Sequence, residues 1–155
     1  TEDVLERRKI YRKQDLDVVF TNGCFDLIHA GHVHILEQAS QQGDRLIVGL
    51  NSDESVRRIK SADRPIMGEQ DRMVVLEAFQ YVDDVVTFDE DTPLRLIKQL
   101  EPDVLVKGAD YEKEEIVGAE WVENHGGRVH RVPLVEGRGT SQIIRDIREG
   151  ATETS

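Results

Sequence analysis

Residues 18–32 read VVFTNGCFDLIHAGH, which predicts a buried strand, a glycine turn and the start of a helix. The apolar run that opens this stretch is short and rich in β-branched residues, as in a strand covered on both faces. Gly23 permits a tight turn, and Gly31 permits close approach of another group to the backbone. A strand followed at once by a glycine turn and a helix is typical of the first crossover in a parallel sheet.

The rest of the chain alternates short apolar runs with amphipathic segments. The runs predict further strands at 46–50, 84–88, 104–106 and 128–132, and the segments predict helices at 33–42, 53–59, 68–79, 93–100, 116–125 and 140–148. We expect Gly43 to end the first helix and Thr92 to cap the helix that begins at Pro93. This order predicts an α/β fold with a doubly wound five-stranded parallel sheet. We expect a single domain over residues 1–155, with its core at about 16–149.

Composition restricts the kind of partner. The chain of 155 residues has a net charge of −11, which argues against a broad nucleic-acid surface but not against small phosphorylated ligands. No apolar run reaches the roughly 20 residues that cross a membrane, and the charged start shows no signal peptide. A single cysteine, Cys24, fits a reducing compartment. We therefore expect a cytoplasmic protein with neither nucleic-acid nor membrane partners.

Two histidines lie where such a fold binds its ligand. Doubly wound sheets bind ligands beyond the carboxyl ends of their strands, where the strand order reverses. His29 and His32 follow the first strand and stand at the start of a helix, whose free N–H groups favour anions. This combination predicts a triphosphate site. The alternatives are that the pair is incidental or binds a metal, although no Cys, third His or carboxylate set completes a metal site.

The motifs around these histidines resemble a known family. GCFD at 23–26 followed by HAGH at 29–32 resembles the cytidylyltransferase-like nucleotidylyltransferases. More closely, FTNGCFD at 20–26, NSD at 51–53, DEDTP at 89–93 and VKGADY at 106–111 resemble the D-glycero-β-D-manno-heptose 1-phosphate adenylyltransferases, which make ADP-heptose for bacterial lipopolysaccharide. The resemblance covers roughly residues 16–149 and implies a Rossmann-like nucleotidylyltransferase fold. In that family the domain occurs alone or fused behind a sugar kinase, which this length is too short to include.

The resemblance also implies a reaction. His29 and His32 match the two motif histidines, which bind the NTP phosphates and stabilise charge on the pentacoordinate phosphorus. The sugar phosphate attacks the α-phosphorus of ATP in line and pyrophosphate leaves, with no covalent enzyme intermediate. We expect Mg²⁺ to be bound mainly through the NTP phosphates, with no dedicated protein site. Family likeness further implies a homodimer.

A second motif lies at the last predicted helix. EGRGTS at 136–141 aligns with the family's Glu-Gly-x-Ser-Thr-Thr/Ser, so Gly137, Thr140 and Ser141 are expected at the β- or γ-phosphate, unless the segment is a simple helix cap. Gly139 replaces the family's usual Ser. LV at 134–135 stands where the cytidylyltransferase branch carries Arg-Thr, which disfavours cytidine.

Residues that end the first and fourth predicted strands complete the nucleotide site. The expected nucleotide contacts are Asn22, Gly23, Cys24, Phe25, Gly31, His32, Lys107, Gly108 and Asp110. The thiol of Cys24 is interpreted as a small filler and not as a nucleophile, because this chemistry requires no thiolate. Gly108 and Ala109 are expected to leave backbone N–H and C=O groups open beside a purine base.

Basic and acidic side chains supply the other candidates. Lys60 and Arg64 share a polar loop, and Arg72 follows on the next helix; we assign charge neutralisation in catalysis to Lys60 and Arg72, although such residues are usually just solvated. Asp91 and Thr92 are expected to bind the sugar phosphate or its hydroxyls, with a plain helix cap as the alternative. Asp26 is also assigned to substrate binding, or else orients a histidine or forms a turn.

Three functions remain open from the sequence. The first is an adenylyltransferase that acts on ATP and heptose 1-phosphate. The second is a glycerol 3-phosphate cytidylyltransferase that uses CTP. The third is a non-catalytic nucleotide-binding module, which Gly139 alone favours and the intact pair His29 and His32 disfavours.

Overall fold

A computed structural model describes residues 1–133 and 140–153 of the chain. Its centre is a five-stranded sheet in the order β3-β2-β1-β4-β5, in which every pair of neighbours is parallel. The strands are β1 (Val18–Gly23), β2 (Arg45–Asn51), β3 (Asp84–Phe88), β4 (Val104–Gly108) and β5 (Arg128–Val132). The predicted α/β fold with a five-stranded parallel sheet is thereby confirmed.

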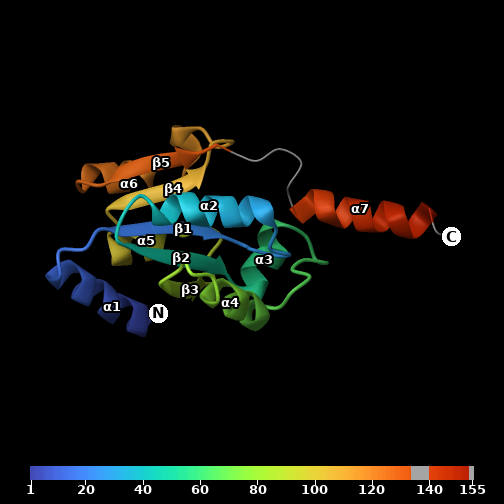
Figure 1. Ribbon diagram of the computed structural model, residues 1–155, viewed down its shortest axis with the longest axis horizontal. Helices are drawn as coiled ribbons and strands as arrows, with labels where there is room; N and C mark the ends of the chain where they lie inside the picture. Colours follow the sequence, from blue (N-terminus) through green and yellow to red (C-terminus); the bar gives the residue numbers. More distant parts are fainter. Residues whose placement is uncertain (134–139, 154–155) are drawn as a thin grey trace.

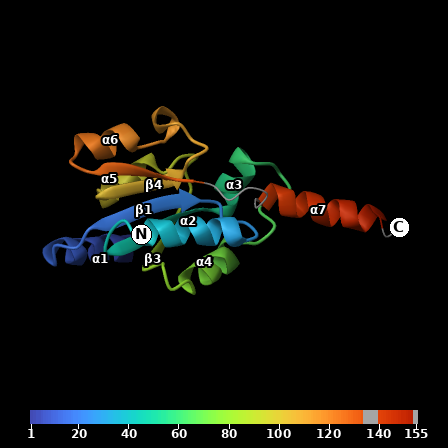
Figure 2. The same cartoon turned by 45° about the horizontal axis from the view of Figure 1, so that its top comes forward.

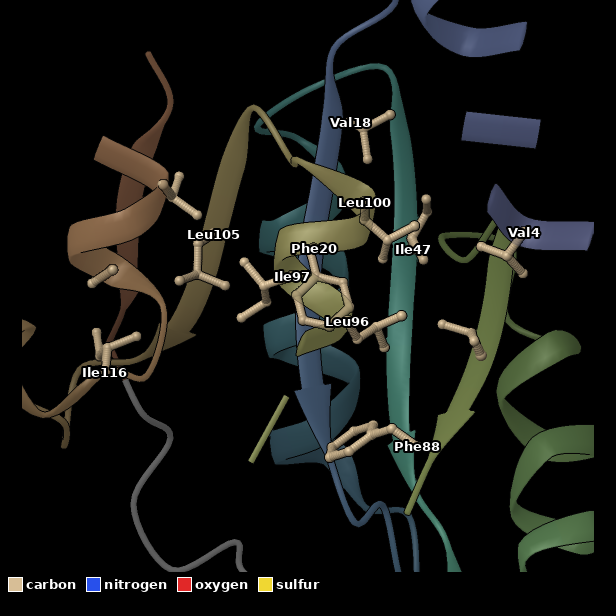
Figure 3. Close-up of a cluster of buried hydrophobic side chains, with 13 residues drawn as sticks. Val4, Val18, Phe20, Ile47, Phe88, Leu96, Ile97, Leu100, Leu105 and Ile116 are labelled. Atoms are coloured by element: carbon tan, nitrogen blue, oxygen red, sulfur yellow. The ribbon is translucent and has the colours of Figure 1, made fainter. Parts of the chain in front are cut away.

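Helices cover both faces of this sheet (Figures 1 and 2). On one face, α2 (Ala30–Ser40) and α4 (Glu69–Glu77) bury apolar side chains against the strands. On the other, α1 (Glu2–Lys13), α5 (Leu94–Leu100) and α6 (Ala119–Asn124) enclose the cluster drawn in Figure 3. Successive residues of β1 alternate between the two cores: Val18 and Phe20 join the second cluster and Val19 the first. This alternation is why the strand is apolar without interruption.

The strand order reverses between β1 and β4. The chain runs from β1 to β2 and β3 on one side, then returns to place β4 and β5 on the other. β1 pairs with β2 over six residues but with β4 over only two, Val19 with Val104 and Phe20 with Leu105. Beyond that point side chains bridge the strands: the Thr21 hydroxyl donates to the Val106 carbonyl oxygen at 2.9 Å. The two strands therefore part toward their carboxyl ends and open the sheet there.

The first helix, α1, was not expected from its charged sequence. It is held by Arg8, which is 5% exposed and donates to the carbonyl oxygens of Leu100 at 2.9 Å and Glu101 at 2.8 Å. These carbonyls end α5, so the guanidinium satisfies acceptors that a helix C-terminus leaves unpaired. A basic side chain of the charged N-terminal segment thus joins two helices.

Several helix boundaries differ from expectation. α2 begins at Ala30 and ends at Ser40, and Gly43 does not end it through a left-handed turn; a Cβ at Gly43 would lie 2.8 Å from Val19 Cγ2, so close packing requires glycine there. Pro93, not Thr92, is the N-cap of α5, and it makes no side-chain cap. α6 starts only at Ala119, because Gly118 has a left-handed φ of 88° and a 3-10 turn, η1 (Lys113–Glu115), precedes it.

The remaining helices are α3 (Asp53–Ile59), at its predicted bounds, and α7 (Thr140–Glu153), which extends on the side where the strands end (Figure 1). Within residues 1–133 and 140–153, no helix combines the length and apolar character needed to cross a membrane.

Candidate active site

A cleft of about 530 Å³ opens at the carboxyl ends of β1 and β4, where these strands part. α2 borders it from one face of the sheet, and the start of α5 and the turn before α6 border it from the other. Twelve residues expected at the site line this cleft: Asn22, Gly23, Cys24, Phe25, Asp26, His29, Gly31, His32, Lys60, Asp91, Thr92 and Lys107.

Backbone N–H groups fix the ring orientation of both histidines at the start of α2. His29 is the N-cap, and its Nδ1 accepts a hydrogen bond from the Gly31 N–H at 3.0 Å. The His29 N–H in turn donates to Nδ1 of His32 at 3.2 Å, and the ring centroids lie 3.9 Å apart. A neutral imidazole that accepts at Nδ1 carries its proton on Nε2. The arrangement therefore leaves two neighbouring Nε2–H donors beside a helix N-terminus.

The histidines are neutral at pH 7 when no anion is present. Burial and, to a lesser extent, the neighbouring His29 lower the pKa of His32 to about 4, although Asp26 acts in the opposite direction. Burial also lowers the pKa of His29. Both rings can then donate hydrogen bonds, and two positive charges are not brought together at neighbouring rings.

Fixed positive charge comes from Lys60, Arg64 and Lys107, which all line the cleft. Nζ of Lys107 donates to the Asn22 carbonyl oxygen at 3.0 Å and lies 5.6 Å from the centroid of the Tyr111 ring. Burial lowers the pKa of Lys107 to about 8, against the opposing effects of Cys24 and Asp110. A chain of net charge −11 thus gathers cations where an anionic ligand would enter.

The side chain of Asn22 contributes an unused acceptor. Its Oδ1 is the one buried side-chain polar atom without a hydrogen-bond partner in the part of the chain that the structure describes. An unpaired buried oxygen is costly, and a donor from a bound ligand would remove that cost.

Asp26 holds the neighbouring loop in place. Its Oδ2 accepts from Nε of Arg64 at 3.0 Å and from the Ile66 N–H at 2.8 Å, and its Oδ1 accepts from the Met67 N–H at 3.0 Å. Burial raises the pKa of Asp26, but these backbone and guanidinium donors bring it below its ordinary value. Asp26 therefore holds Arg64 at the cleft, and because Asp26 itself lines the cleft, its contact with the substrate stays a prediction.

Arg72 is held by protein acceptors on all sides. Its side chain is fully buried, and its guanidinium donates to the carbonyl oxygens of Met67, Cys24 and Asn51 and to the carboxylate of Asp53, at 2.6–2.9 Å. Every nitrogen of the group is engaged within the protein. Arg72 therefore joins the loop after β1, the end of β2 and the start of α3, and this full engagement within the protein argues against the predicted contact with substrate charge.

Two of the backbone groups that were expected to be open after β4 are engaged within the protein. The Ala109 N–H donates to the Val132 carbonyl oxygen at 2.7 Å, and the Gly108 carbonyl accepts from the Tyr111 N–H at 3.2 Å. Gly108 and Asp110 flank the cleft without lining it. Gly137 and the side chains of Thr140 and Ser141 lie outside the described residues.

Another part of the lining was not assigned to the site from the sequence. Tyr111, Glu115, Ile116 and Val117 come from the segment between β4 and α6, and they face the cleft together with Pro93. Tyr111 ends the motif at 106–111, but Glu115, Ile116 and Val117 belong to no motif, and only the strand order places them beside the start of α5.

Comparisons with known proteins identify the family of the chain. A family model described as cytidylyltransferase-like matches residues 20–137. The chain is 59% identical over 134 residues to "Bifunctional protein HldE" of Geotalea uraniireducens, covering 86% of this chain and 27% of that protein. A protein of the same name from Syntrophotalea carbinolica is 54% identical over 145 residues, covering 94% of this chain and 29% of that protein. The chain thus spans under a third of the length of these relatives.

A solved structure shows the same fold. The lipopolysaccharide core biosynthesis protein from Thermoplasma volcanium superposes with a TM-score of 0.63 over 77% of this chain and 97% of that one, at 24% sequence identity.

Proposed function

Because the chain belongs to the cytidylyltransferase-like family, we propose that it is an adenylyltransferase that transfers AMP from ATP to a heptose 1-phosphate. The products are ADP-heptose and pyrophosphate. The motifs at 20–26, 51–53, 89–93 and 106–111 support the heptose branch of the family, and identities of 54–59% to proteins named HldE agree with that choice.

The observation that carries the proposal is the oriented histidine pair. His29 and His32 both use Nδ1 within the start of α2, so their Nε2–H groups remain for phosphate oxygens. Lys60, Arg64 and Lys107 line the same cleft and balance the charge of a triphosphate. Donors fixed before the substrate arrives stabilise a developing charge without reorganisation.

The proposed reaction is a single displacement at phosphorus. A phosphate oxygen of the sugar phosphate attacks the α-phosphorus of ATP, and the bond from that phosphorus to the bridging oxygen breaks as pyrophosphate leaves with the electron pair. The nucleophile is already ionised, so no general base is required. His29 and His32 donate to the oxygens of the phosphoryl group in transfer, while Lys60 and Lys107 hold the chain of phosphates in line.

Mg²⁺ is proposed to arrive on the triphosphate. In the described ranges, no group of three or more His, Cys, Asp or Glu residues stands close enough to hold a metal ion. Of the cleft carboxylates, Asp26 is engaged by protein donors and Asp91 pairs with Arg58 at 2.9 Å. This donor set fits an ion bound by phosphate oxygens and water, which neutralises phosphate charge. Gly137, Thr140 and Ser141 as phosphate contacts, and assembly as a homodimer, remain proposals.

The test is product formation from defined substrates. The purified chain is supplied with Mg²⁺ and either ATP with D-glycero-β-D-manno-heptose 1-phosphate or CTP with glycerol 3-phosphate. Pyrophosphate release is followed, and the sugar nucleotide is identified by mass. We expect ADP-heptose. CDP-glycerol in its place would identify a cytidylyltransferase, and nucleotide binding without pyrophosphate release from either pair would identify a binding module.

A further inference from the structure

The two borders of the cleft differ in chemistry. At the α2 border stand the histidine donors and the helix N-terminus. At the opposite border, on the face of the sheet covered by α5 and α6, the lining residues are Asp91, Thr92, Pro93, Glu115, Ile116 and Val117. The apolar wall and the carboxylates of Asp91, which pairs with Arg58, and Glu115 make that border less suitable for a triphosphate than the α2 border and suitable for a neutral polyhydroxyl group.

Glu115 is fixed in place by its neighbours in sequence. It ends the 3-10 turn η1, and its N–H donates to the Glu112 carbonyl oxygen at 2.9 Å. Lys113, at the start of the turn, pairs with Glu123 of α6 at 2.7 Å. On the other side Ile116 is 5% exposed and packs into the cluster of Figure 3. The turn is therefore anchored at both ends, and Glu115 stands between the anchors.

The carboxylate of Glu115 is available to a ligand. Among the described residues it forms neither a hydrogen bond nor an ion pair through its side chain, whereas Asp91 is paired with Arg58 and Asp26 with Arg64. An ionised carboxylate only accepts hydrogen bonds, and sugar hydroxyls donate them. Beside it, Val117 is 38% exposed and offers apolar surface to the C–H groups of a sugar ring.

We propose that Glu115 is a specificity-determining residue for the acceptor and that its carboxylate binds hydroxyl groups of the sugar phosphate. The assignment rests on the proposed function and adds the orientation of the two substrates. The triphosphate lies along the α2 border, and the sugar lies against the turn before α6. The reacting phosphorus is then over the carboxyl ends of β1 and β4, near Lys107.

The test compares two neighbouring substitutions, Glu115→Gln and Glu114→Gln. Glu114 belongs to the same turn but lines a separate hollow between α5 and α6, so it is a matched control. We expect Glu115→Gln to raise the KM for heptose 1-phosphate roughly tenfold or more, the scale of one hydrogen bond to a charged group. The KM for ATP, the Mg²⁺ requirement and the melting temperature should stay at wild-type values, and Glu114→Gln should change none of them.

The outcomes separate this proposal from the one on which it rests. If the wild-type chain makes ADP-heptose and both variants keep its KM for the sugar phosphate, the role of Glu115 is refuted and the proposed function stands. A raised KM for ATP would place Glu115 at the nucleotide, and a raised Mg²⁺ requirement would place it at the metal; either result overturns the proposal. If the wild-type chain makes no ADP-heptose, both proposals fall.

Discussion

At the scale of single residues, the two ring nitrogens of His29 and of His32 have different roles. Each Nδ1 accepts a backbone N–H at the start of α2, which leaves each Nε2–H for the proposed contact with phosphate. We expect His29→Ala and His32→Ala each to lower kcat by about 10²-fold or more, as for loss of one transition-state donor. The measurement is pyrophosphate release, with circular dichroism to verify folding.

His34→Ala is the control, because His34 lies on the same helix outside the cleft lining. It should keep wild-type turnover. Wild-type turnover in the His29 and His32 variants would remove these residues from the mechanism, and loss of the folded spectrum would make them structural.

The depressed pKa of His32 links stability to pH. The unfolded chain takes up a proton at this residue below its ordinary pKa of 6.5, whereas the folded protein does so only near 4. The free energy of unfolding should therefore fall as pH drops from 6.5 toward 4, by about 2 kcal/mol between pH 7 and 5. Urea unfolding at both pH values measures this change. The pKa of Asp26 is also lowered, but from 3.8, so its contribution is lost only below this window.

His32→Asn isolates the histidine, since an amide oxygen can still accept the His29 N–H. The variant should show a smaller loss of stability over the same pH interval. An unchanged loss would assign the pH dependence to other groups.

At the scale of elements, Arg72 of α4 connects the loop after β1, the end of β2 and the start of α3. Arg72→Ala leaves buried acceptors and the Asp53 carboxylate without their donor, so we expect the free energy of unfolding to drop by about 3 kcal/mol. Arg95→Ala removes an exposed pair with Glu90 and should cost about 0.5 kcal/mol or less. Urea denaturation compares the two. If Arg72→Ala kept full stability and lost turnover, Arg72 would regain the catalytic role first assigned to it.

The start of α6 requires glycine for two separate reasons. Gly118 has a φ of 88°, and a Cβ there would lie 2.7 Å from Ile97 Cδ1 of α5. Gly126, which follows α6, has a similar φ of 87°, but a Cβ there would have no neighbour within 4 Å among the described residues. Alanine at either position should cost about 1 kcal/mol of backbone strain. Gly118→Ala should cost at least about 1 kcal/mol more, because it also overpacks the core. Equal unfolding free energies for the two variants would show that Ile97 moves aside freely.

At the scale of the whole molecule, the prediction concerns the choice between ATP and CTP. We expect ATP to be preferred over CTP, because the chain has LV at 134–135 where the cytidine-using branch carries Arg-Thr, and loss of a polar partner for the base weakens selection strongly. Open backbone groups beside the base were a second reason for this expectation, and the engagement of the Ala109 N–H and the Gly108 carbonyl weakens it. The specificity constants for ATP and CTP with one sugar phosphate decide the matter. A specificity constant ten times higher for CTP than for ATP would identify the chain as a cytidylyltransferase and not an adenylyltransferase.

The sequence by itself determined the five-stranded sheet, most of its helices and the place of the histidine pair at the end of β1. Each depends on a signal spread over a few neighbouring residues: β-branched runs for strands, helical spacing for helices, and the close succession of Gly23, His29 and His32 for the anion site. In a doubly wound fold, the carboxyl ends of strands meet at one edge, so short motifs after β1 and β4 had to converge.

Only the tertiary structure decided the roles of the buried charges and the second border of the cleft. Arg72 reaches Cys24 across 48 positions of sequence, Arg8 reaches Leu100 across 92, and Glu115 stands opposite α2 only because β4 returns beside β1. A basic or acidic residue looks the same in sequence whether it is solvated, buried or at a ligand. Its role depends on the distant donors and acceptors that packing brings within about 3 Å of it. The neighbouring residues in the sequence do not indicate which groups these are.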